Sequence, residues 1–443
     1  MDVRDYASRT LTGTNPGVAM HRWLTWWTAA LVFIFPVVVA TTNGGGSYVY
    51  TLLVLPALYY GRHWQNLSLW ERRILLGFVV ALIAMSLSFI NSEDIRQGLK
   101  YLERYLRFVL MIPVYLMMRR YSLALGRELG VGAIVACVVM AVQGGYQVSW
   151  VGHEFASGYY HKIVFGDLAV LWGALAVIFA LTMARGGLGI GIAAISASAA
   201  LYASVLSQTR GSWLFVPVFI LTLLWMYRKE LLANRQMVLA GFVVMLALMS
   251  FGIWKSDRFV QGVERGAEDL RIFMQDPSAA TSWGIRLNLW RNTLLIVEEH
   301  PILGSGLGDF HQEMRDMAAD GRSWSTAVED FGHAHSIYFD ALANGGLVGL
   351  IATVVAYLLL PLLAFGRGLR NAITPEQRFY AMGGLVTVLA FATFGLSEAL
   401  WARNPFVNTY VVCIVVFLAS MVNSGVRLAK DKCDGGQGEL ARL

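Results

Sequence analysis

The stretch His333–Leu350, HAHSIYFDALANGGLVGL, changes character within a few residues. It begins with two histidines, passes an aspartate and a Gly-Gly pair, and continues as an apolar run. An apolar run long enough to cross about 30 Å of hydrocarbon is typical of a membrane helix. Ionisable groups at the end of such a helix are candidates for a functional site. This stretch therefore predicts an all-α integral membrane protein with a polar site at one membrane face.

The composition of the whole chain also indicates a bilayer as its solvent. The 443 residues are 56% hydrophobic and 14% charged, with a mean hydropathy of +0.55, whereas soluble domains have about 25% charged residues. A net charge of +6 is typical of cytoplasmic Lys and Arg in a membrane protein, so it does not indicate nucleic acid as a partner. Cys137, Cys413 and Cys433 are far apart, and we expect neither a disulfide nor a cysteine metal site.

Apolar runs recur along the chain and predict about twelve transmembrane helices, because irregular backbone cannot face lipid. We expect the first run to be a retained anchor, since no A-x-A cleavage site follows it. The predicted spans are 23–42, 47–60, 74–90, 105–118, 129–149, 164–184, 187–206, 211–227, 236–254, 345–366, 379–400 and 405–424.

Basic residues predict the orientation of these spans. Lys and Arg precede the first span and follow each even-numbered one, so the positive-inside rule places those loops and both termini in the cytoplasm. We therefore expect transmembrane helices 1–9 in residues 1–254, a large extracytoplasmic helical loop in 255–334, helices 10–12 in 335–425 and a cytoplasmic tail in 426–443. Within the loop, SDRFVQGVERGAEDLRIFM is amphipathic, and SWGIRLNLWRNTLLIVEEHP predicts a helix with Ser282 as N-cap and Pro301 as stop.

Arginines on the outer face are informative because the positive-inside rule disfavours them there. Lys100, Arg104 and Arg107 share one helical face, where they either snorkel or bind an anionic lipid headgroup. Arg210, in SQTRGSW, lies between two apolar spans, a costly position that marks a substrate pathway unless a carboxylate pairs with it.

Arg286 is expected in the first turn of a loop helix, where its guanidinium and the positive helix end both favour a phosphate. Arg291 lies five residues after Arg286 and is therefore expected on a different face of the same helix. A guanidinium suits phosphate because it bonds two oxygens at once.

Other polar groups allow more than one interpretation. GSGLGDF, residues 304–310, resembles a dinucleotide loop but follows a helix, so we expect a tight turn. We expect no metal at His311, His333 and His335, because no partner carboxylate is evident. Asp167 and Asp340 are candidates for proton relay or for pairing with polar neighbours, and Glu398 and Arg403 are candidates to pair with each other.

His335 is either a buried histidine satisfied by a neighbour or a base. An imidazole has a pKa near 6.5, so it can accept a proton at neutral pH. Beside a phosphate-binding pair of arginines, such a base suits one chemistry: the arginines hold a diphosphate leaving group while the base deprotonates an attacking hydroxyl.

Three motifs in this order resemble those of the O-antigen ligase and O-antigen polymerase superfamily. HSIYFDALANGGLVGL resembles its histidine motif, SQTRGSW its S-x-x-R-G element, and RLNLWRNTLLIVEEHPILGSGLGDF its periplasmic stretch. The resemblance covers residues 160–366 most closely. The chain differs at Asn344, where many members have a glutamate before the glycine pair.

The resemblance implies a GT-C-type glycosyltransferase of lipopolysaccharide biosynthesis that needs no metal or other cofactor. Such a ligase transfers O-antigen from undecaprenyl diphosphate to lipid A-core at the periplasmic face of the bacterial inner membrane. It implies that His335 is the base and that Arg210 and Arg286 bind the diphosphate. Further candidates for accessory roles are Lys100, Arg104, Arg107, His161, Lys162, His333 and Arg291.

Two other functions remain open at this stage. An O-antigen polymerase would use the same donor with a carrier-linked acceptor, although one long loop beside the histidine helix favours the ligase. A secondary transporter would be expected to have internal repeats and broken helices near mid-bilayer. The sequence has no evident repeat, and its notable charges gather at one face.

Overall fold

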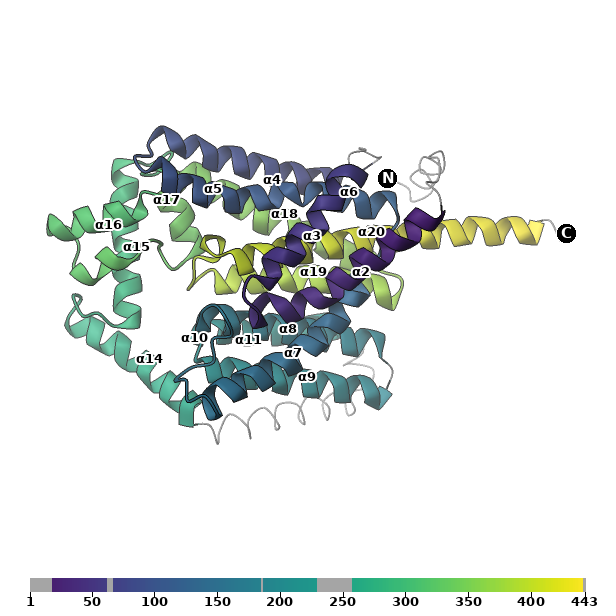
Figure 1. Ribbon diagram of the computed structural model, residues 1–443, viewed down its shortest axis with the longest axis horizontal. Helices are drawn as coiled ribbons and strands as arrows, with labels where there is room; N and C mark the ends of the chain where they lie inside the picture. Colours follow the sequence, from purple (N-terminus) through teal and green to yellow (C-terminus); the bar gives the residue numbers. More distant parts are fainter. Residues whose placement is uncertain (1–17, 62–66, 185, 229–256, 441–443) are drawn as a thin grey trace.

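The computed structural model describes residues 18–61, 67–184, 186–228 and 257–440. Within these ranges every regular element is a helix, and an elongated bundle meets a smaller group of helices at one end (Figure 1). The predicted all-helical class is confirmed for this part of the chain.

Seven of the described helices are long and apolar enough to cross a membrane, and Arg210–Met226 forms a shorter apolar segment. The seven are Arg22–Thr41, Leu69–Ile90, Gly126–Ser149, Lys162–Met183, Gly186–Ser207, Ile337–Arg370 and Asn404–Leu428. The chain is thus a multi-pass membrane protein. Every predicted span coincides with a helix except 236–254, which lies outside the described residues together with 1–17. The count of twelve spans stays a prediction.

The N-terminal part of the bundle differs from the prediction at one helix. It consists of α2 (Val18–Thr41), α3 (Gly45–Tyr60), α4 (Leu69–Leu87), the short η1 (Ser88–Ile90), α5 (Ile95–Leu110), α6 (Ile112–Arg120) and α7 (Gly126–Ser149). The predicted span 105–118 is divided between α5 and α6 at Met111, because Pro113 lies at the start of α6 and cannot donate a helical hydrogen bond. Lys100, Arg104 and Arg107 therefore all belong to α5.

A fully packed helix, α8 (Lys162–Met183), forms the centre of the bundle. It lies against α7, α9 (Gly186–Ser207) and α19 (Pro375–Phe394). Of the residues in its most apolar stretch, 94% are buried. After α9 the chain forms α10 (Arg210–Trp213) and α11 (Phe215–Met226), and after α19 it forms η4 (Leu400–Ala402) and the long α20 (Asn404–Leu440). The predicted span 379–400 is too long, because α19 ends at Phe394 and leaves residues 395–399 as a turn. This turn becomes part of the site.

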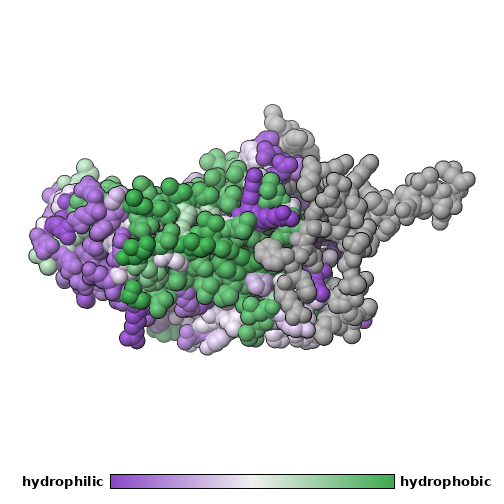
Figure 2. All heavy atoms as spheres, turned by 90° about the horizontal axis from the view of Figure 1, so that it is seen from above, coloured by the Kyte–Doolittle hydropathy of each residue, from purple (hydrophilic) through white to green (hydrophobic). Residues whose placement is uncertain are grey.

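A group of polar helices covers one end of the bundle. We call it the polar cap: α14 (Asp257–Gln275), α15 (Ser282–Glu299), α16 (Phe310–Ala319) and η2 (Thr326–Asp330). Figure 2 shows its hydrophilic surface against the hydrophobic body of the bundle. Its own apolar core includes Leu289, Ile296, Phe310, Met314 and Val328. The start of α2 and the end of α20 lie at the opposite end of the bundle (Figure 1).

The two predicted cap helices are confirmed, with one correction. Thr281, not Ser282, is the N-cap of α15, because its extended backbone lets its hydroxyl accept a hydrogen bond from the Gly284 amide at 3.0 Å. Ser282 is the first helical residue, and α15 ends at Glu299, shortly before Pro301.

The glycine turn 304–308 fixes the polar cap against α17 (Ile337–Ala352), which continues through a π-helical turn, Thr353–Leu359, into α18 (Leu360–Arg370). Gly304, Gly306 and Gly308 all have positive φ, so the predicted tight turn is confirmed. Asn344 accepts a hydrogen bond from the Gly308 amide at 3.2 Å and donates one to the Asp340 carbonyl at 2.8 Å. The Asn344 amide thus serves as a structural link between the glycine turn and α17.

Candidate functional site

His335 precedes α17 in an unusual backbone conformation. Its φ is +50°, in the left-handed region that non-glycine residues rarely adopt and that is often found at functional sites. The next two residues hold this geometry, because the Ser336 hydroxyl and the Ile337 amide both donate to the Gly395 carbonyl, at 3.0 and 2.9 Å. The loop is therefore fastened to the turn after α19.

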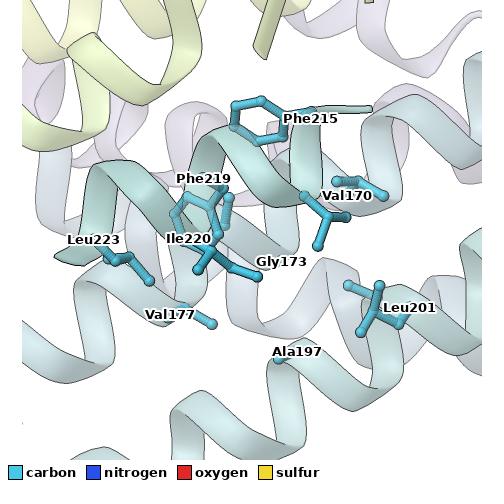
Figure 3. Close-up of a pocket in the computed structure, with 12 residues that line it drawn as sticks. Val170, Gly173, Val177, Ala197, Leu201, Phe215, Phe219, Ile220 and Leu223 are labelled. Atoms are coloured by element: carbon cyan, nitrogen blue, oxygen red, sulfur yellow. The ribbon is translucent and has the colours of Figure 1, made fainter. Parts of the chain in front are cut away.

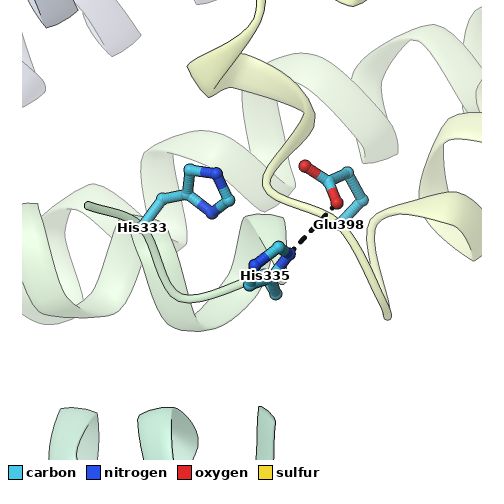
Figure 4. Close-up of side chains that lie close together, drawn as sticks. All are labelled: His333, His335 and Glu398. Atoms are coloured by element: carbon cyan, nitrogen blue, oxygen red, sulfur yellow. Dashed lines mark hydrogen bonds and ion pairs between the residues drawn. The ribbon is translucent and has the colours of Figure 1, made fainter. Parts of the chain in front are cut away.

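This fastening brings the His335 ring to Glu398 (Figure 4). Nδ1 of His335 lies 3.1 Å from Oε2 of Glu398, and Nε of Arg403 donates to Oε1 at 2.9 Å. The Glu398 side chain is 1% exposed. Burial alone would raise the pKa of this carboxyl group, but the hydrogen bond with His335 and the charges of His335 and Arg403 hold it well below its usual range.

Because Glu398 stays a carboxylate, it can only accept a hydrogen bond from the imidazole. Nδ1 of His335 then carries the proton, and in the neutral ring Nε2 has a free lone pair. The predicted pairing of Glu398 with Arg403 is confirmed, and the same carboxylate also orients His335.

The segment before His335 is held from two other sides. The Tyr101 hydroxyl of α5 donates to the Gly332 carbonyl at 2.6 Å, and the Trp290 indole of α15 donates to the Ala334 carbonyl at 2.9 Å. His333 packs edge-on against His335, with ring centroids 4.4 Å apart. Burial lowers the pKa of His333 to about 4, so this ring is neutral at pH 7.

Arg286 reaches the same turn from the polar cap. Its Nε donates to the Ser397 carbonyl at 3.3 Å, and its Nη1 donates to the carbonyl and hydroxyl of Ser282, at 3.0 and 2.7 Å. Arg286 is the fifth residue of α15, so its predicted place in the first turn is wrong; the guanidinium instead bends back toward that turn. Burial lowers its pKa, and the charge of Glu398 opposes this change.

Arg210 approaches from the bundle side. It is the first residue of α10, and its Nη2 lies 3.1 Å from Oδ2 of Asp269 on α14. The next residue, Gly211, touches the turn so closely that a Cβ there would lie 2.3 Å from the Ser397 hydroxyl. The charge of Arg210 also acts on Arg286. The structure thus brings both arginines to the turn 395–398, and Arg210 has the carboxylate partner that the sequence left open.

His161 and Lys162 begin α8 beside this group. Nδ1 of His161 accepts from the Ile163 amide at 3.3 Å, and burial together with the charge of Arg403 lowers the pKa of His161. Lys162 lies 3.8 Å from the centre of the Phe155 ring, and its carbonyl accepts from the Thr209 hydroxyl at 2.8 Å. This last bond joins the start of α8 to the residue before Arg210.

The other accessory candidates lie around the site rather than in it. Arg104 stacks over the Tyr101 ring at 4.8 Å, and Tyr101 in turn binds the Gly332 carbonyl before His335. Lys100 is exposed and donates to Gln97, and Arg107 binds Glu103 and Asn408. Arg291 lies over Trp324 and donates to the Arg322 carbonyl, so it holds the polar cap together.

His333, His335 and Glu398 also form a group that could hold a metal ion, with ligand atoms all within 4.8 Å of one another. Two imidazoles and a carboxylate are a ligand set that Zn²⁺ accepts. Both Glu398 oxygens, however, already bind His335 and Arg403, and a cation there would face the positive charges of Arg403 and Arg286. The arrangement suits an oriented base better than a metal centre.

Comparison with known proteins identifies the segment that holds these residues. Residues 195–354 match the family model described as O-antigen ligase, and this range includes Arg210, Arg286 and His335. This segment of the chain is similar to O-antigen ligases. The family resemblance seen in the sequence is thereby confirmed.

The O-antigen ligase match supports a glycosyltransferase-like activity of the ligase or polymerase type in lipopolysaccharide biosynthesis. Lipid-linked polysaccharide and lipid A-core are the general substrates of such a family. A protein of Haemophilus influenzae described as an uncharacterized protein is 22% identical over 364 residues, which cover 78% of this chain and 86% of that one.

Sequence reasoning missed the bond between Glu398 and His335, because 63 positions separate the two residues. The only signal for it was a glutamate near the end of the predicted span 379–400. Asp269 was also missed as the partner of Arg210, since it lies within an amphipathic helix with several other charges.

Proposed function

We propose that the protein transfers O-antigen from undecaprenyl diphosphate to lipid A-core, at the periplasmic face of the inner membrane, by an inverting and metal-independent GT-C-type reaction. The observation that supports this most is the His335–Glu398 hydrogen bond beside Arg286 and Arg210, where the apolar bundle meets the polar cap.

In the proposed reaction, the acceptor hydroxyl oxygen attacks C1 of the sugar as the bond from C1 to the phosphate oxygen breaks on the opposite side. Nε2 of His335 takes the hydroxyl proton, and the electron pair of the broken bond leaves with the diphosphate. Glu398 is a positioning residue: it fixes the imidazole and stabilises its positive charge. A positioned base of this kind contributes about 10²–10⁴ in rate.

Arg286 and Arg210 would stabilise the charge that grows on the leaving diphosphate. The Arg286 guanidinium bonds the Ser397 carbonyl beside Glu398, and Arg210 directly precedes Gly211, which contacts the same turn. Each guanidinium can bond two phosphate oxygens. Arg210 would exchange Asp269 for the diphosphate when the donor binds. Removal of one such donor typically costs about 10²–10³ in rate.

The proposed orientation has two supports. The polar cap lies at the end of the bundle opposite to the start of α2 and the end of α20 (Figure 1), and the basic loops predict that those ends are cytoplasmic. The site would then face the periplasm.

The deciding experiment is reconstitution of the purified protein in vesicles with carrier-linked glycan and lipid A-core. We expect lipid A-core that bears the glycan, and no product from His335→Ala. Longer carrier-linked chains as the product would instead identify a polymerase. Counterflow of a labelled solute without glycan transfer would indicate a transporter, and full activity of His335→Ala would refute the base.

Arg210→Lys separates a guanidinium fork from a simple positive charge. We expect it to lose activity while remaining in the membrane, because an ammonium group cannot bond two phosphate oxygens in the same geometry. Undiminished transfer by this variant would refute the two-point contact, and inhibition by EDTA would favour the metal interpretation of His333, His335 and Glu398.

A further inference from the structure

Asp167, in the second turn of α8, is a buried carboxyl group that the proposed reaction does not use. The residue is 2% exposed, and its Oδ1 has no hydrogen-bond partner among the residues that the structure describes. Such groups are uncommon in folded proteins, and a functional role or a bound water or ion usually explains them. The surroundings of Asp167 determine which ligand can supply the missing partner.

Asp167 lies where α8 meets the arginine side of the site. The residue before it, Gly166, packs so tightly that a Cβ there would lie 2.6 Å from Oγ1 of Thr209, which directly precedes Arg210. One turn further along α8, Val170 faces the apolar space between α8, α9 and α11 (Figure 3). Because the side chains that line this space are apolar, a partner for Oδ1 has to come from the site.

Three charged side chains of the site act on the Asp167 carboxyl group. They are Glu398, whose influence is the largest of the three, Arg286 and Arg403. The charge of Asp167 acts on Arg286 in return. Both arginines are bonded elsewhere, because Arg403 donates to Glu398 and Arg286 donates to the Ser397 carbonyl. Asp167 is therefore within the electrostatic reach of the site, with an acceptor oxygen still unfilled.

These charges restrict the kind of ligand that can bind at Oδ1. A cation would be repelled by Arg286 and Arg403, and an ionised phosphate would be repelled by Glu398 and has no proton to donate. A carboxyl group keeps an acceptor oxygen in either protonation state. A neutral O–H or N–H donor therefore completes Asp167, and the hydroxyl and acetamido groups of sugars are donors of this kind.

We propose that Asp167 accepts a hydrogen bond from the first sugar of the carrier-linked donor. The inference rests on the proposed function, in which the diphosphate lies at Arg210 and Arg286 and the reacting C1 lies near His335. The first sugar is bonded directly to the diphosphate, so it lies between Arg286 and His335. Asp167 faces the same region, because the charges of Arg286 and Glu398 both act on it.

The contact forms when the site opens for its donor. In the structure, Arg286 is held by the Ser397 carbonyl and by Ser282. A diphosphate draws Arg286 from these bonds, and the sugar that follows it meets an Asp167 oxygen that has no bond to break. A hydrogen bond to a carboxylate is worth about 10–100-fold in affinity. A held sugar ring also keeps C1 aligned for attack.

The test compares undecaprenyl diphosphate that carries one sugar with undecaprenyl diphosphate alone. Binding of each carrier is measured on the full-length protein in nanodiscs. We expect Asp167→Leu to weaken binding of the sugar-bearing carrier about 10–100-fold and to leave binding of the bare carrier unchanged. Asp167→Asn keeps an acceptor oxygen and should lose less than about tenfold.

The same measurement separates a sugar contact from a purely electrostatic role. Equal losses in D167N and D167L, or a matching loss for the bare carrier, would mean that the Asp167 charge supports Arg286. Either result would overturn the proposal. Asp167→Ala guards against overpacking by leucine and should show the same selective loss as D167L.

Thermal unfolding of the substrate-free protein separates binding from folding. Replacement of a buried carboxyl group that has no partner should leave the unfolding temperature equal or higher, whereas loss of a structural bond lowers it. We expect D167L and D167N to be at least as stable as the wild type while D167L loses affinity for the sugar-bearing carrier. A lower unfolding temperature in both variants would show that Asp167 has a structural partner, and the proposal would fail.

Ser196→Ala is the matched control. Ser196 is also fully buried, and its hydroxyl lacks a partner within the described part of the chain, but it lies ~17 Å from the end of α9 at the helical rise per residue. S196A should bind both carriers as the wild type does. A loss of sugar-bearing carrier equal to that of D167L would mean that the effect is not specific to the site, which would also overturn the proposal.

The remaining outcomes distinguish this inference from the proposed function. A selective loss of lipid A-core binding in D167L would assign the contact to the acceptor sugar and refute the donor assignment. If Arg210→Ala weakens binding of both carriers but D167L affects neither, the sugar contact fails and the diphosphate site stands. If R210A and Arg286→Ala bind both carriers as tightly as the wild type does, the proposed function itself fails.

Discussion

At the scale of single residues, the site depends on one buried carboxylate with two partners. Glu398 binds His335 through one oxygen and Arg403 through the other, so its charge is balanced and its position fixed. The sequence identified His335 and both arginines as candidates, because their residue types and motifs are local. It could not identify the His335–Glu398 bond, because that contact arises only when the turn after α19 meets the loop before α17.

Glu398→Gln tests this arrangement through its effect on the rate. We expect kcat to fall about 10²–10⁴-fold, because an amide can donate to Nδ1 and so favours the wrong tautomer. The measurement is the kcat of glycan transfer to lipid A-core in vesicles, and a Glu398→Gln variant with the wild-type kcat would contradict the positioning role of the carboxylate.

The control for this experiment is His333→Gln. The pKa of His333 is about 4 and that of Glu398 lies below its usual range, so neither group titrates between pH 5 and 8 in the folded protein. The dependence of the rate on pH between 5 and 8 should therefore be the same in H333Q as in the wild type. A changed profile in that range would show that His333 contributes to it.

At the scale of elements, the helices were largely predictable and their ends were not. Long apolar runs predict spans because the bilayer requires internally bonded backbone. The break between α5 and α6 at Met111 follows from Pro113, a local signal that the apolar run obscures. The early end of α19 at Phe394 instead accompanies contacts of the following turn with the loop before α17. The choice of Thr281 over Ser282 as N-cap depends on backbone angles that two adjacent hydroxyl residues do not reveal.

The Gly-Gly pair in α17 provides a test of one such element. Gly346 has a φ of +58°, and a Cβ there would lie 2.4 Å from the Ile302 carbonyl oxygen. We expect Gly346→Ala to lower the thermal unfolding temperature and the activity together, with a strain cost of about 1–3 kcal/mol.

Gly366→Ala is the matched control, because this glycine lies in α18 with negative φ, and a Cβ there would enter open space among the described residues. Alanine at this position should leave stability equal or slightly higher. Similar destabilisation by both variants would mean that the effect is general to glycine replacement in this segment.

α14 contributes a second element-scale prediction. The helix approaches Arg210 closely at Gly266, where an added Cβ would lie 3.2 Å from Nη1 of Arg210. Asp269 of the same helix pairs with Nη2. Asp269→Asn should lower KM for the carrier-linked donor several-fold, because the diphosphate no longer competes with a carboxylate. The measurement is a donor titration in vesicles at fixed lipid A-core; a raised KM would show that Asp269 instead preorganises Arg210.

At the scale of the whole molecule, the polar cap and the basic loops predict the same orientation. Single cysteines can test it in a Cys433→Ser background, where Cys137 and Cys413 are buried. We expect Asp320→Cys in the polar cap to react with an impermeant maleimide in intact spheroplasts. Asn371→Cys, between α18 and α19, should react only after permeabilisation. The opposite labelling pattern would place the site in the cytoplasm.

The Arg210–Asp269 pair also affects which anions of the surrounding bilayer can bind to the protein in the absence of substrate. A bilayer presents many anionic phospholipids to any unpaired cation at its surface, and each carries little more than one negative charge. A side chain that already holds a carboxylate gives such lipids no net advantage. Only a ligand with a higher charge density, such as a diphosphate, displaces the carboxylate. An internal counter-ion therefore makes the arginine selective against the phospholipids of the surrounding bilayer.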